Sequence, residues 1–528
     1  MKAFFMHRSL AARQARTIKP APFAVMLLAV KVCLAAIPAT TVWEVRTTGS
    51  DTNGGGFDGT ASPSVDYSQN NNKNAAGCSN CGSSSANLST TDALITSASS
   101  TVTSATASFS SALTGNLIYL SGGTCTTGSL AAQWRRAAFS NSTTITLDQA
   151  PSGTFTGTCT GVTMNVGGAM ASPSVVAANK VAGNDVYIKS GTYTISSTSA
   201  TVSNGVVLES TGGVNASNTS IWWGYGSTRG DDGAKPLLQA SGIATASLFK
   251  VTGSHVTLRN LSLDGAGLTG IKCVEQTSGS YGKYIRLKAS NCTNKAFDLT
   301  IANLGWAVSL EATGCSTASG VITLGGSTGG VLGYNIEAHD NTATGILING
   351  TGFCSNCLSY RNTGASSDGF DFPSGPGGTL LNSVAAYNGR YGVNITSSRG
   401  IATLVANTIA YGNATGFATD QVQDGAYVFN SASGGNTSSN YNSAQLIHLM
   451  NHVALTSDPF TNAGSSANGA ADFSLNTAAG GGAALRTAGF SGYSPSGNSR
   501  GYGDIGAIQH ADSAGGGSTV LKSFTFLQ

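Results

Sequence analysis

The hydrophobic pattern between residues 255 and 420 repeats about every 22 to 26 residues. One part of the repeat is a six-residue phrase in which apolar or small positions alternate with polar ones. The phrase occurs as LSLDGA (261), LKASNC (287), LEATGC (310), IEAHDN (336), LSYRNT (358), VAAYNG (384) and IAYGNA (409). Alternation with a period of two predicts short β-strands, and a repeat of this length predicts one coil of a parallel β-helix.

A second strand is predicted a few residues after each phrase, where a small residue precedes an apolar one. These steps are Gly270-Ile271, Ala296-Phe297, Gly320-Val321, Gly345-Ile346, Gly369-Phe370, Gly392-Val393 and Gly416-Phe417. Because successive strand residues point to opposite faces, we expect Phe370 and Phe372 to point inward and Asp371 to face solvent. Stacking of the coils then predicts an outward column of Lys272, Asp298, Ile322, Leu347, Asp371, Asn394 and Ala418.

Polar residues near the phrase ends fall into further predicted columns. One column holds Asn291, Asp340, Asn362, Asn388 and Asn413. Asparagine amides stacked at a turn hydrogen-bond along the stack, so this column is interpreted as structural. The other columns are Asp368 with Thr344 and Tyr391, Cys292 with Cys315, and His339 with Arg361 and Tyr387. The last column is the most chemically mixed, and it predicts either a sugar-binding face or a solvated row of turns.

The composition supports an all-β chain. Only 10% of the 528 residues are charged and 70 are glycine, which is typical of many short strands joined by tight turns. Nine of the ten cysteines lie beyond residue 39, which favours an oxidising compartment. The two CSNC stretches, at Cys78/Cys81 and Cys354/Cys357, admit a zinc site of four thiolates, but local disulfides are favoured. An odd cysteine count leaves at least one thiol free if the rest pair.

Residues 1–39 are expected to be an export leader, with five cations ahead of the apolar stretch APFAVMLLAV. The alternatives are an anchored segment or a start codon placed too early. Loss of the leader, which holds six cations and no acids, lowers the formal net charge from +3 to −3. Nucleic-acid binding is therefore not expected. No second apolar segment is long enough to span a bilayer, so no stable membrane span is expected after leader removal.

Four segments resemble the right-handed parallel β-helix proteins of the pectate-lyase-like superfamily, especially uncharacterised phage and bacterial members. They are TTVWEVRTTGSDTNGGGF (40–57), VAGNDVYIKSGTYTISS (181–197), WWGYGSTRGDDGAKPLLQASG (222–242) and GYGDIGAIQHA (501–511). The resemblance implies an all-β, right-handed parallel β-helix with an inserted small β module and a C-terminal cap. The expected parts are the leader (1–39), an N-terminal cap and loop (40–91), the inserted module (92–167), the helix (168–430), and C-terminal coils with the cap (431–528).

The resemblance also implies chemistry, because members of this superfamily cleave or bind acidic polysaccharides along an outer sheet. SSDGFDF is similar to an Asp-Gly-Phe turn that helps to hold calcium in one lyase branch, which would carry over only to Asp368 as a Ca²⁺ ligand. The next coil reads GRYGVNI and lacks the further acids of that branch. No lysine occurs from 296 to 521, so a lysine base is excluded there. Arginine could act as a base only if its very high pKa were overcome.

The candidate catalytic residues are therefore Asp368, Asp371, Arg361 and Asp340, with Ca²⁺ as the only cofactor suggested. The candidate substrate-binding residues are His339, Arg361, Tyr387, Arg390 and Tyr391. Three functions remain open: recognition of a surface polysaccharide by an extracellular or virion-associated protein, cleavage of an acidic glycan by a lyase or hydrolase, and a purely structural surface role. Recognition is favoured, because the lysine and the second acid cluster are missing. A homo-oligomer also remains open, although no coiled-coil heptads are seen.

Overall fold

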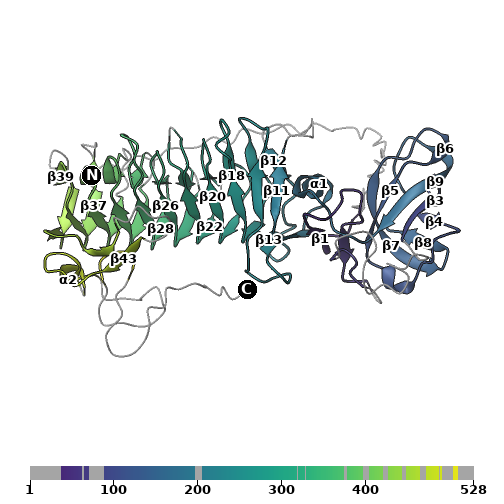
Figure 1. Ribbon diagram of the computed structural model, residues 1–528, viewed down its shortest axis with the longest axis horizontal. Helices are drawn as coiled ribbons and strands as arrows, with labels where there is room; N and C mark the ends of the chain where they lie inside the picture. The colour runs from purple at the N-terminus through teal and green to yellow at the C-terminus, as the bar shows by residue number, and fades with distance from the viewer. Residues whose placement is uncertain are drawn as a thin grey trace, which may run out of the picture. The chain divides into compact units, whose positions relative to one another are not determined.

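The structure is a computed structural model of the whole chain. It describes residues 37–508 except for gaps at 62–64, 70–87, 197–204, 302, 318, 327–328, 374–376, 397–402, 420–425, 443–446, 464–470, 487 and 490–503. Three sheets of parallel strands run through most of this part of the chain (Figure 1). Each coil contributes one strand to each sheet, so neighbours within a sheet are one coil apart in the sequence. The all-β, right-handed parallel β-helix expected from the sequence is confirmed.

The largest sheet has 13 strands, and its first pair, β2 with β1, is antiparallel. The order is β2 (Gly56–Asp58), β1 (Thr41–Val45), β10 (Asp185–Lys189), β13 (Ser220–Tyr225), β16 (Val256–Arg259), β19 (Lys283–Ile285), β22 (Gly305–Val308), β25 (Val331–Tyr334), β28 (Phe353–Ser355), β31 (Thr379–Leu381), β34 (Leu404–Ala406), β37 (Ala426–Phe429) and β40 (Ile447–Met450). Because β2 covers the outer edge of β1, the first parallel strand is not left open to pairing with another chain.

The second sheet has 11 strands and the third has 10. The 11-stranded sheet consists of β11 (Thr192–Ile195), β14 (Leu237–Ala240), β17 (Ser262–Asp264), β20 (Lys288–Ser290), β23 (Glu311–Thr313), β26 (Glu337–His339), β29 (Leu358–Tyr360), β32 (Val384–Ala386), β35 (Ile409–Tyr411), β38 (Ala432–Gly434) and β41 (Val453–Leu455). The 10-stranded sheet consists of β12 (Gly205–Glu209), β15 (Ser247–Val251), β18 (Lys272–Gln276), β21 (Phe297–Leu299), β24 (Ile322–Leu324), β27 (Ile346–Ile348), β30 (Phe370–Phe372), β33 (Tyr391–Ile395), β36 (Thr415–Thr419) and β39 (Ser439–Tyr441).

The core of the helix is a continuous apolar cluster enclosed by the three sheets. Phe370 and Phe372 point into it with exposed fractions of 0% and 2%, as predicted. The strand register places Asp371 in the outward column Glu275, Asp298, Thr323, Leu347, Asp371, Asn394 and Ala418. The predicted members Lys272 and Ile322 were therefore wrong. The predicted steps were out of register: the partners of Phe297 are Val274, three residues after the expected Ile271, and Ile322, one residue after the expected Val321.

A small β module is inserted between β2 and β10, as expected. Its strands are β3 (Ser89–Thr96), β4 (Thr101–Thr103), β5 (Leu117–Ser121), β6 (Thr124–Thr127), β7 (Gln133–Asn141), β8 (Thr144–Leu147) and β9 (Thr156–Val166), with a 3-10 turn, η1 (Ser111–Leu113). Six of them form a closed barrel, because β3 pairs with both β4 and β9. β6 extends the sheet at β9. The barrel has its own apolar core, and the disulfide between Cys125 and Cys159 joins β6 to β9.

Two aromatic side chains connect the barrel with the first coil. Trp134 of β7 lies 6.4 Å from the Trp43 ring, and its indole nitrogen donates to the carbonyl of Asn53 at 2.9 Å. Helix α1 (Pro173–Asn179) follows the barrel and buries Val176 and Ala177 in the same cluster as Trp43. Apolar contacts thus continue from the helix core into the inserted module.

The chain beyond β41 forms the cap that was expected at the C-terminus. Its described elements are the antiparallel pair β42 (Phe460–Asn462) and β43 (Asp472–Leu475) and the short helix α2 (Gly482–Leu485). They pack on the outward residues of the last strands of the 11-stranded sheet in one buried cluster, which includes Tyr360, Val384, Ala386, Ile409, Phe460, Phe473, Leu485 and Ile505. Within the described residues, no helix is both long enough and apolar enough to cross a membrane.

The cap explains an error of one residue in the predicted columns. The sequence alignment paired Leu358 with Ile336, and Arg361 with His339. In the structure Leu358 pairs with Glu337 and Tyr360 pairs with His339, so the alignment is wrong by one residue. Leu358, Val384 and Ile409 look like core residues by composition, yet they occupy outward positions beside the cap. Since strand faces alternate with a period of two, a shift of one residue reverses every assignment. His339 is therefore not in its predicted column, where Asp340 instead lies in line with Arg361 and Tyr387.

The predicted asparagine ladder is present, but the same shift of one residue changes two of its members. Asn341 occupies the place predicted for Asp340, and Asn291 lies outside the ladder. Side-chain amides hydrogen-bond from coil to coil at 2.9 to 3.4 Å through Asn341, Asn362, Asn388, Asn413 and Asn436. A second row, which sequence analysis missed, consists of asparagines with positive φ just before the 11-stranded sheet, at Asn335, Asn356, Asn382, Asn407, Asn430 and Asn451. Asparagine tolerates this left-handed conformation better than most residues.

The cysteines confirm the structural interpretation as far as the structure describes them. Cys354 and Cys357 form a local disulfide, which excludes them as zinc thiolates, whereas Cys78 and Cys81 lie outside the described residues. Cys292 is bridged to Cys273 and also stacks beneath Cys315, whose sulfur accepts its backbone N–H at 3.4 Å. Cys315 is the free cysteine of the described chain, and burial raises its thiol pKa to about 12. Such a thiol is inert rather than nucleophilic.

Candidate functional site

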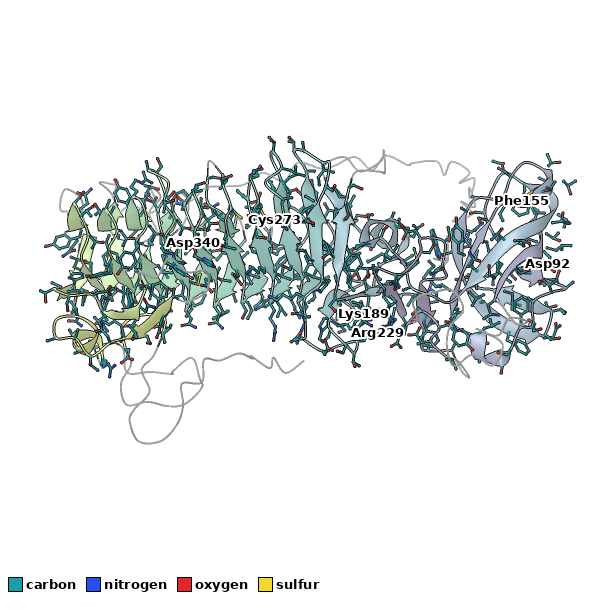
Figure 2. All side chains as sticks on the ribbon, in the orientation of Figure 1. Asp92, Phe155, Lys189, Arg229, Cys273 and Asp340 are labelled. Carbon is teal, nitrogen blue, oxygen red and sulfur yellow. A yellow bond between two sulfur atoms is a disulfide. The ribbon has the colours of Figure 1, made fainter. Side chains whose placement is uncertain are left out.

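The outer face of the 11-stranded sheet changes character where the cap begins. From β29 onward its outward residues are apolar and lie under the cap. In the coils just before the cap the outward residues are charged, and they meet the polar corner that follows each strand. We call this group the His339 cluster, and it consists of Lys288, Glu311, Glu337, His339, Asp340, Tyr360 and Arg361. Figure 2 labels Asp340, which marks the position of the cluster in the middle coils.

The His339 imidazole lies between carboxylates from two coils. Its Nδ1 is 2.8 Å from Oδ2 of Asp340, and its Nε2 is 3.6 Å from Oε1 of Glu311 and 4.0 Å from Oε1 of Glu337. The ring stacks on Tyr360 of the next strand, with 5.0 Å between centroids and 6° between planes. The Tyr360 hydroxyl donates to Glu337 at 2.6 Å. Because Tyr360 also packs on Phe473 of the cap, the cap holds one side of the cluster in place.

Electrostatics shift the pKa values of His339 and Glu311 toward their charged forms. Burial disfavours the imidazolium, but the attraction of the Glu311 and Asp340 carboxylates outweighs it and raises the pKa of His339. The nearby His339 ring, reinforced by Lys288 against the effect of burial, lowers the pKa of the Glu311 carboxyl to about 2. Lys288 reaches Glu311 at 2.6 Å. Around neutral pH the cluster therefore presents ionised carboxylates together with cations that can donate hydrogen bonds.

The raised pKa of His339 predicts how stability changes with pH. A group whose pKa is higher in the folded state contributes stability that is complete below its unfolded pKa and is lost as pH rises through the folded pKa. We therefore expect wild-type stability to decline relative to His339→Gln as pH increases from about 6 to about 8. Urea unfolding of both proteins across this range checks the difference. A difference that stays constant or grows with pH would contradict the assignment. His452, whose pKa is lowered by burial, has the opposite dependence and is present in both proteins.

Asp340 and Arg361 form the corner of the cluster. The Arg361 guanidinium donates to both carboxylate oxygens of Asp340, at 2.7 and 2.8 Å, and its carbon lies 4.7 Å from the Tyr360 ring centroid. The bond from Arg361 is the main reason why the pKa of Asp340 is lowered. Both residues have positive φ, at 54° and 51°. The structure thus brings together three of the predicted candidates, His339, Asp340 and Arg361, although Arg361 and His339 are in different columns.

Asp368 lies apart from this cluster, two residues before strand β30 of the 10-stranded sheet. Its side chain is fully buried, and its two carboxylate oxygens accept hydrogen bonds from Arg390 at 2.8 and 2.6 Å. The backbone N–H of Tyr391 and the amide of Asn394 also donate to it, at 3.1 and 3.2 Å. A calcium ligand needs oxygen lone pairs that face an open coordination site. The expectation of Asp368 as a Ca²⁺ ligand beside Arg361 does not fit this closed arrangement.

The remaining candidates are spread over two surfaces. Asp371 points outward and accepts a hydrogen bond from Asn394 at 3.0 Å. Arg390 stacks over the Tyr391 ring at 4.5 Å while it binds Asp368. Tyr387, expected to face a sugar, donates to Asp458 at 2.6 Å and packs against the cap. Among the described residues, no group of three or more His, Cys, Asp or Glu side chains could hold a metal ion.

Sequence analysis missed four members of the His339 cluster. Glu311 and Glu337 occupy the second position of two consecutive phrases, LEATGC and IEAHDN, and Lys288 occupies the same position one coil earlier. This row of charges could have been found from the sequence, since residues at the same position of successive repeats lie side by side on one face. Tyr360 could not be identified, because the sequence alignment paired Arg361, rather than Tyr360, with His339.

Comparisons with known proteins found similarity among solved structures. No family model matches the sequence, and no curated protein matches it. Among solved structures, a rhamnogalacturonan lyase is 17% identical and covers 51% of this chain and 70% of its own, with a TM-score of 0.35. The pectate lyase Pel9A is 16% identical over 65% of this chain and 92% of its own, with a TM-score of 0.31. ORF18 of Geobacillus virus E2 is 12% identical over 53% and 56%, with a TM-score of 0.24.

These identities and TM-scores are too low to carry an argument about activity. The strand order and register described above place the chain among proteins with the parallel β-helix fold.

Proposed function

We propose that the protein recognises a polysaccharide through the His339 cluster. The observation that carries the proposal is a row of ionised, partly exposed side chains on one outward sheet face beside the cap. The exposed fractions are 32% for Glu311, 36% for Glu337, 35% for Asp340 and 40% for Lys288. Carboxylates accept hydrogen bonds from sugar hydroxyls, and Lys288 can donate to sugar oxygens. A ligand rich in hydroxyl groups uses both kinds of partner.

The rigidity of the row supports recognition. Each carboxylate is already positioned by a neighbour: Glu311 by Lys288, Glu337 by Tyr360, and Asp340 by Arg361. A site whose side chains are held before the ligand arrives loses less conformational entropy on binding. An extracellular or virion location belongs to the same proposal, and the disulfides of the described chain support it because they persist in oxidising surroundings.

Glycan cleavage is the second candidate, and one observation favours it. Glu311 and Glu337 are direct partners on adjacent parallel strands, which places their backbones about 4.8 Å apart. Retaining glycosidases hold two carboxyl groups about 5 to 5.5 Å apart. However, hydrolysis also requires a carboxylic acid that stays protonated. The pKa values of Glu311 and Asp340 are lowered rather than raised, so the cluster is better suited to binding.

Replacement of cluster residues is expected to weaken glycan binding at least about tenfold, because each loss removes a charge-assisted hydrogen bond of about 1.5 to 3 kcal/mol. The variants are Glu337→Gln and Lys288→Met, measured by titration against a panel of neutral and uronate-containing polysaccharides. Asp371→Asn, on another sheet, is the control and should bind as the wild type does. A chelator should leave binding unchanged.

The same panel separates recognition from cleavage when new reducing ends and new unsaturated ends are followed over time. Wild-type binding by both cluster variants would place the glycan site elsewhere. Release of reducing ends that is lost in Glu311→Gln would favour the hydrolase over the binding protein.

A further inference from the structure

The outer face of the 13-stranded sheet is apolar over its last eight strands. Two columns of side chains point outward there, set by the register of neighbouring strands. We call them together the aromatic face, and its members are Lys283, Trp306, Leu332, Phe353, Thr379, Leu404, Tyr427 and His448 in one column, and Ile285, Val308, Tyr334, Ser355, Leu381, Ala406, Phe429 and Met450 in the other. None of these positions is an aspartate or a glutamate.

This face differs from the outward faces of the other two sheets. The 10-stranded sheet presents acids and amides such as Glu275, Asp298 and Asn394, and the 11-stranded sheet becomes apolar only where the cap packs on it. On the aromatic face, Tyr427 and Met450 are 38% and 50% exposed. Parallel sheets are normally covered on both faces. The other apolar side chains of the face are partly buried, except for Val308 and Ala406, which are buried. A contiguous apolar surface that is partly exposed marks an interaction site.

We propose that the aromatic face is a docking surface for a second copy of this chain. Protein interfaces have cores rich in aromatic residues and methionine and poor in Asp, Glu and Lys, which describes this face, where Lys283 is the one charged side chain of that set. A glycan would need convergent hydrogen-bonding groups, and Thr379, Ser355 and His448 supply few. An uncharged strip is complementary to itself, since two copies bring together no like charges along most of its length.

The rings of the face are already ordered. Tyr427 stacks on His448 with 5.0 Å between centroids, and Tyr334 lies 5.4 Å from Phe353. Lys283 lies above the Trp306 ring at 5.9 Å, at the end of the strip farthest from Met450. Side chains fixed by their neighbours lose little rotamer freedom when a partner covers them. The strands that carry them belong to the rigid ladder of the helix, so docking requires no rearrangement of backbone.

The size of the face predicts weak association. Seven spacings of about 4.8 Å and side chains at the margins give a strip about 40 Å long and about 15 Å wide. Burial of this strip would cover about 600 Å² on each copy, which is at the lower end of specific interfaces. We therefore expect a concentration-dependent oligomer with a dissociation constant in the micromolar range. The inference does not rest on the polysaccharide proposal, because the two surfaces lie on different sheets.

Sedimentation equilibrium of the full chain, from about 1 to about 200 μM, tests the proposal. The wild type is expected to self-associate. The double variant Leu332→Lys with Leu404→Lys is expected to associate at least about tenfold more weakly, because docking would desolvate four ammonium groups. Ser290→Lys, at an outward position of the 11-stranded sheet, is the matched control and should associate like the wild type. Tyr427→Lys is a milder second variant in case the double variant does not fold.

Two outcomes would overturn the proposal. One is a wild type that remains monomeric at the highest concentration. Another is unchanged association of a folded aromatic-face variant, which would place the interface elsewhere. If the wild type is monomeric, a lower melting temperature of Tyr427→Lys would show that a segment of the same chain covers the face instead.

Discussion

The Phe370→Asp variant is expected to be unfolded across the middle coils under conditions in which the wild-type chain is fully folded. Phe370 is completely buried, and it is stacked between Ile346 and Val393 of the neighbouring coils. Loss of a buried phenylalanine alone costs about 3 to 5 kcal/mol. An ionised carboxylate in the same place costs several kcal/mol more, because the enclosed core offers it no partner. The total is comparable with the whole stability of a typical domain.

Urea unfolding followed by far-ultraviolet circular dichroism measures this effect. Phe370→Leu is the matched control, since it keeps an apolar side chain of smaller volume and should cost only about 1 to 3 kcal/mol. Asp371→Asn, at the next position on the outward face, should be nearly neutral. A melting temperature for Phe370→Asp equal to that of the wild type would contradict the register of the 10-stranded sheet.

The second large effect is expected at Asp368. Its replacement by Asn removes the charge that binds Arg390 and keeps the shape of the side chain. Loss of one partner of a buried pair costs about 3 to 5 kcal/mol when the other charge stays buried. The Arg390 side chain is 36% exposed and can turn toward water. We therefore expect a cost of about 2 to 3 kcal/mol.

A double-mutant cycle with Arg390→Gln identifies the cause. If the two side chains act as a pair, the double variant should cost clearly less than the sum of the single variants. Additive costs would show that the two residues stabilise the fold independently. Glycan binding by Asp368→Asn, measured at a temperature where the variant is folded, should equal that of the wild type, because Asp368 lies outside the His339 cluster.

The position of Asp368 shows how a turn motif can mislead. SSDGFDF suggested a calcium ligand because it is similar to an Asp-Gly-Phe turn that helps to hold calcium in one lyase branch. In the structure Asp368 instead links one coil to the next, because it accepts hydrogen bonds from Arg390 and from the backbone N–H of Tyr391. The arginine that completes the pair lies 22 residues later. The sequence alone does not show that the Arg390 side chain points toward Asp368, because this depends on how the two coils stack.

The sequence by itself determined the repeat, the parallel β-helix, the inward direction of Phe370 and Phe372, and the existence of an asparagine ladder. These features are local or periodic: alternation within a strand fixes its faces, and a regular repeat brings equivalent residues together. The CSNC disulfide at Cys354 and Cys357 was predictable for the same reason, since its partners are three residues apart.

Only the tertiary structure decided the register beyond residue 336 and therefore the membership of the candidate site. Leu358, Val384 and Ile409 are apolar, and hydrophobicity alone assigns apolar residues to the core. The cap buries them on the outer face instead. The burial of a side chain depends on every segment that packs against it, including one about a hundred residues later, whereas the sequence pattern records only its neighbours along the chain. The pairing of β29 with β26 places Tyr360, rather than Arg361, against His339.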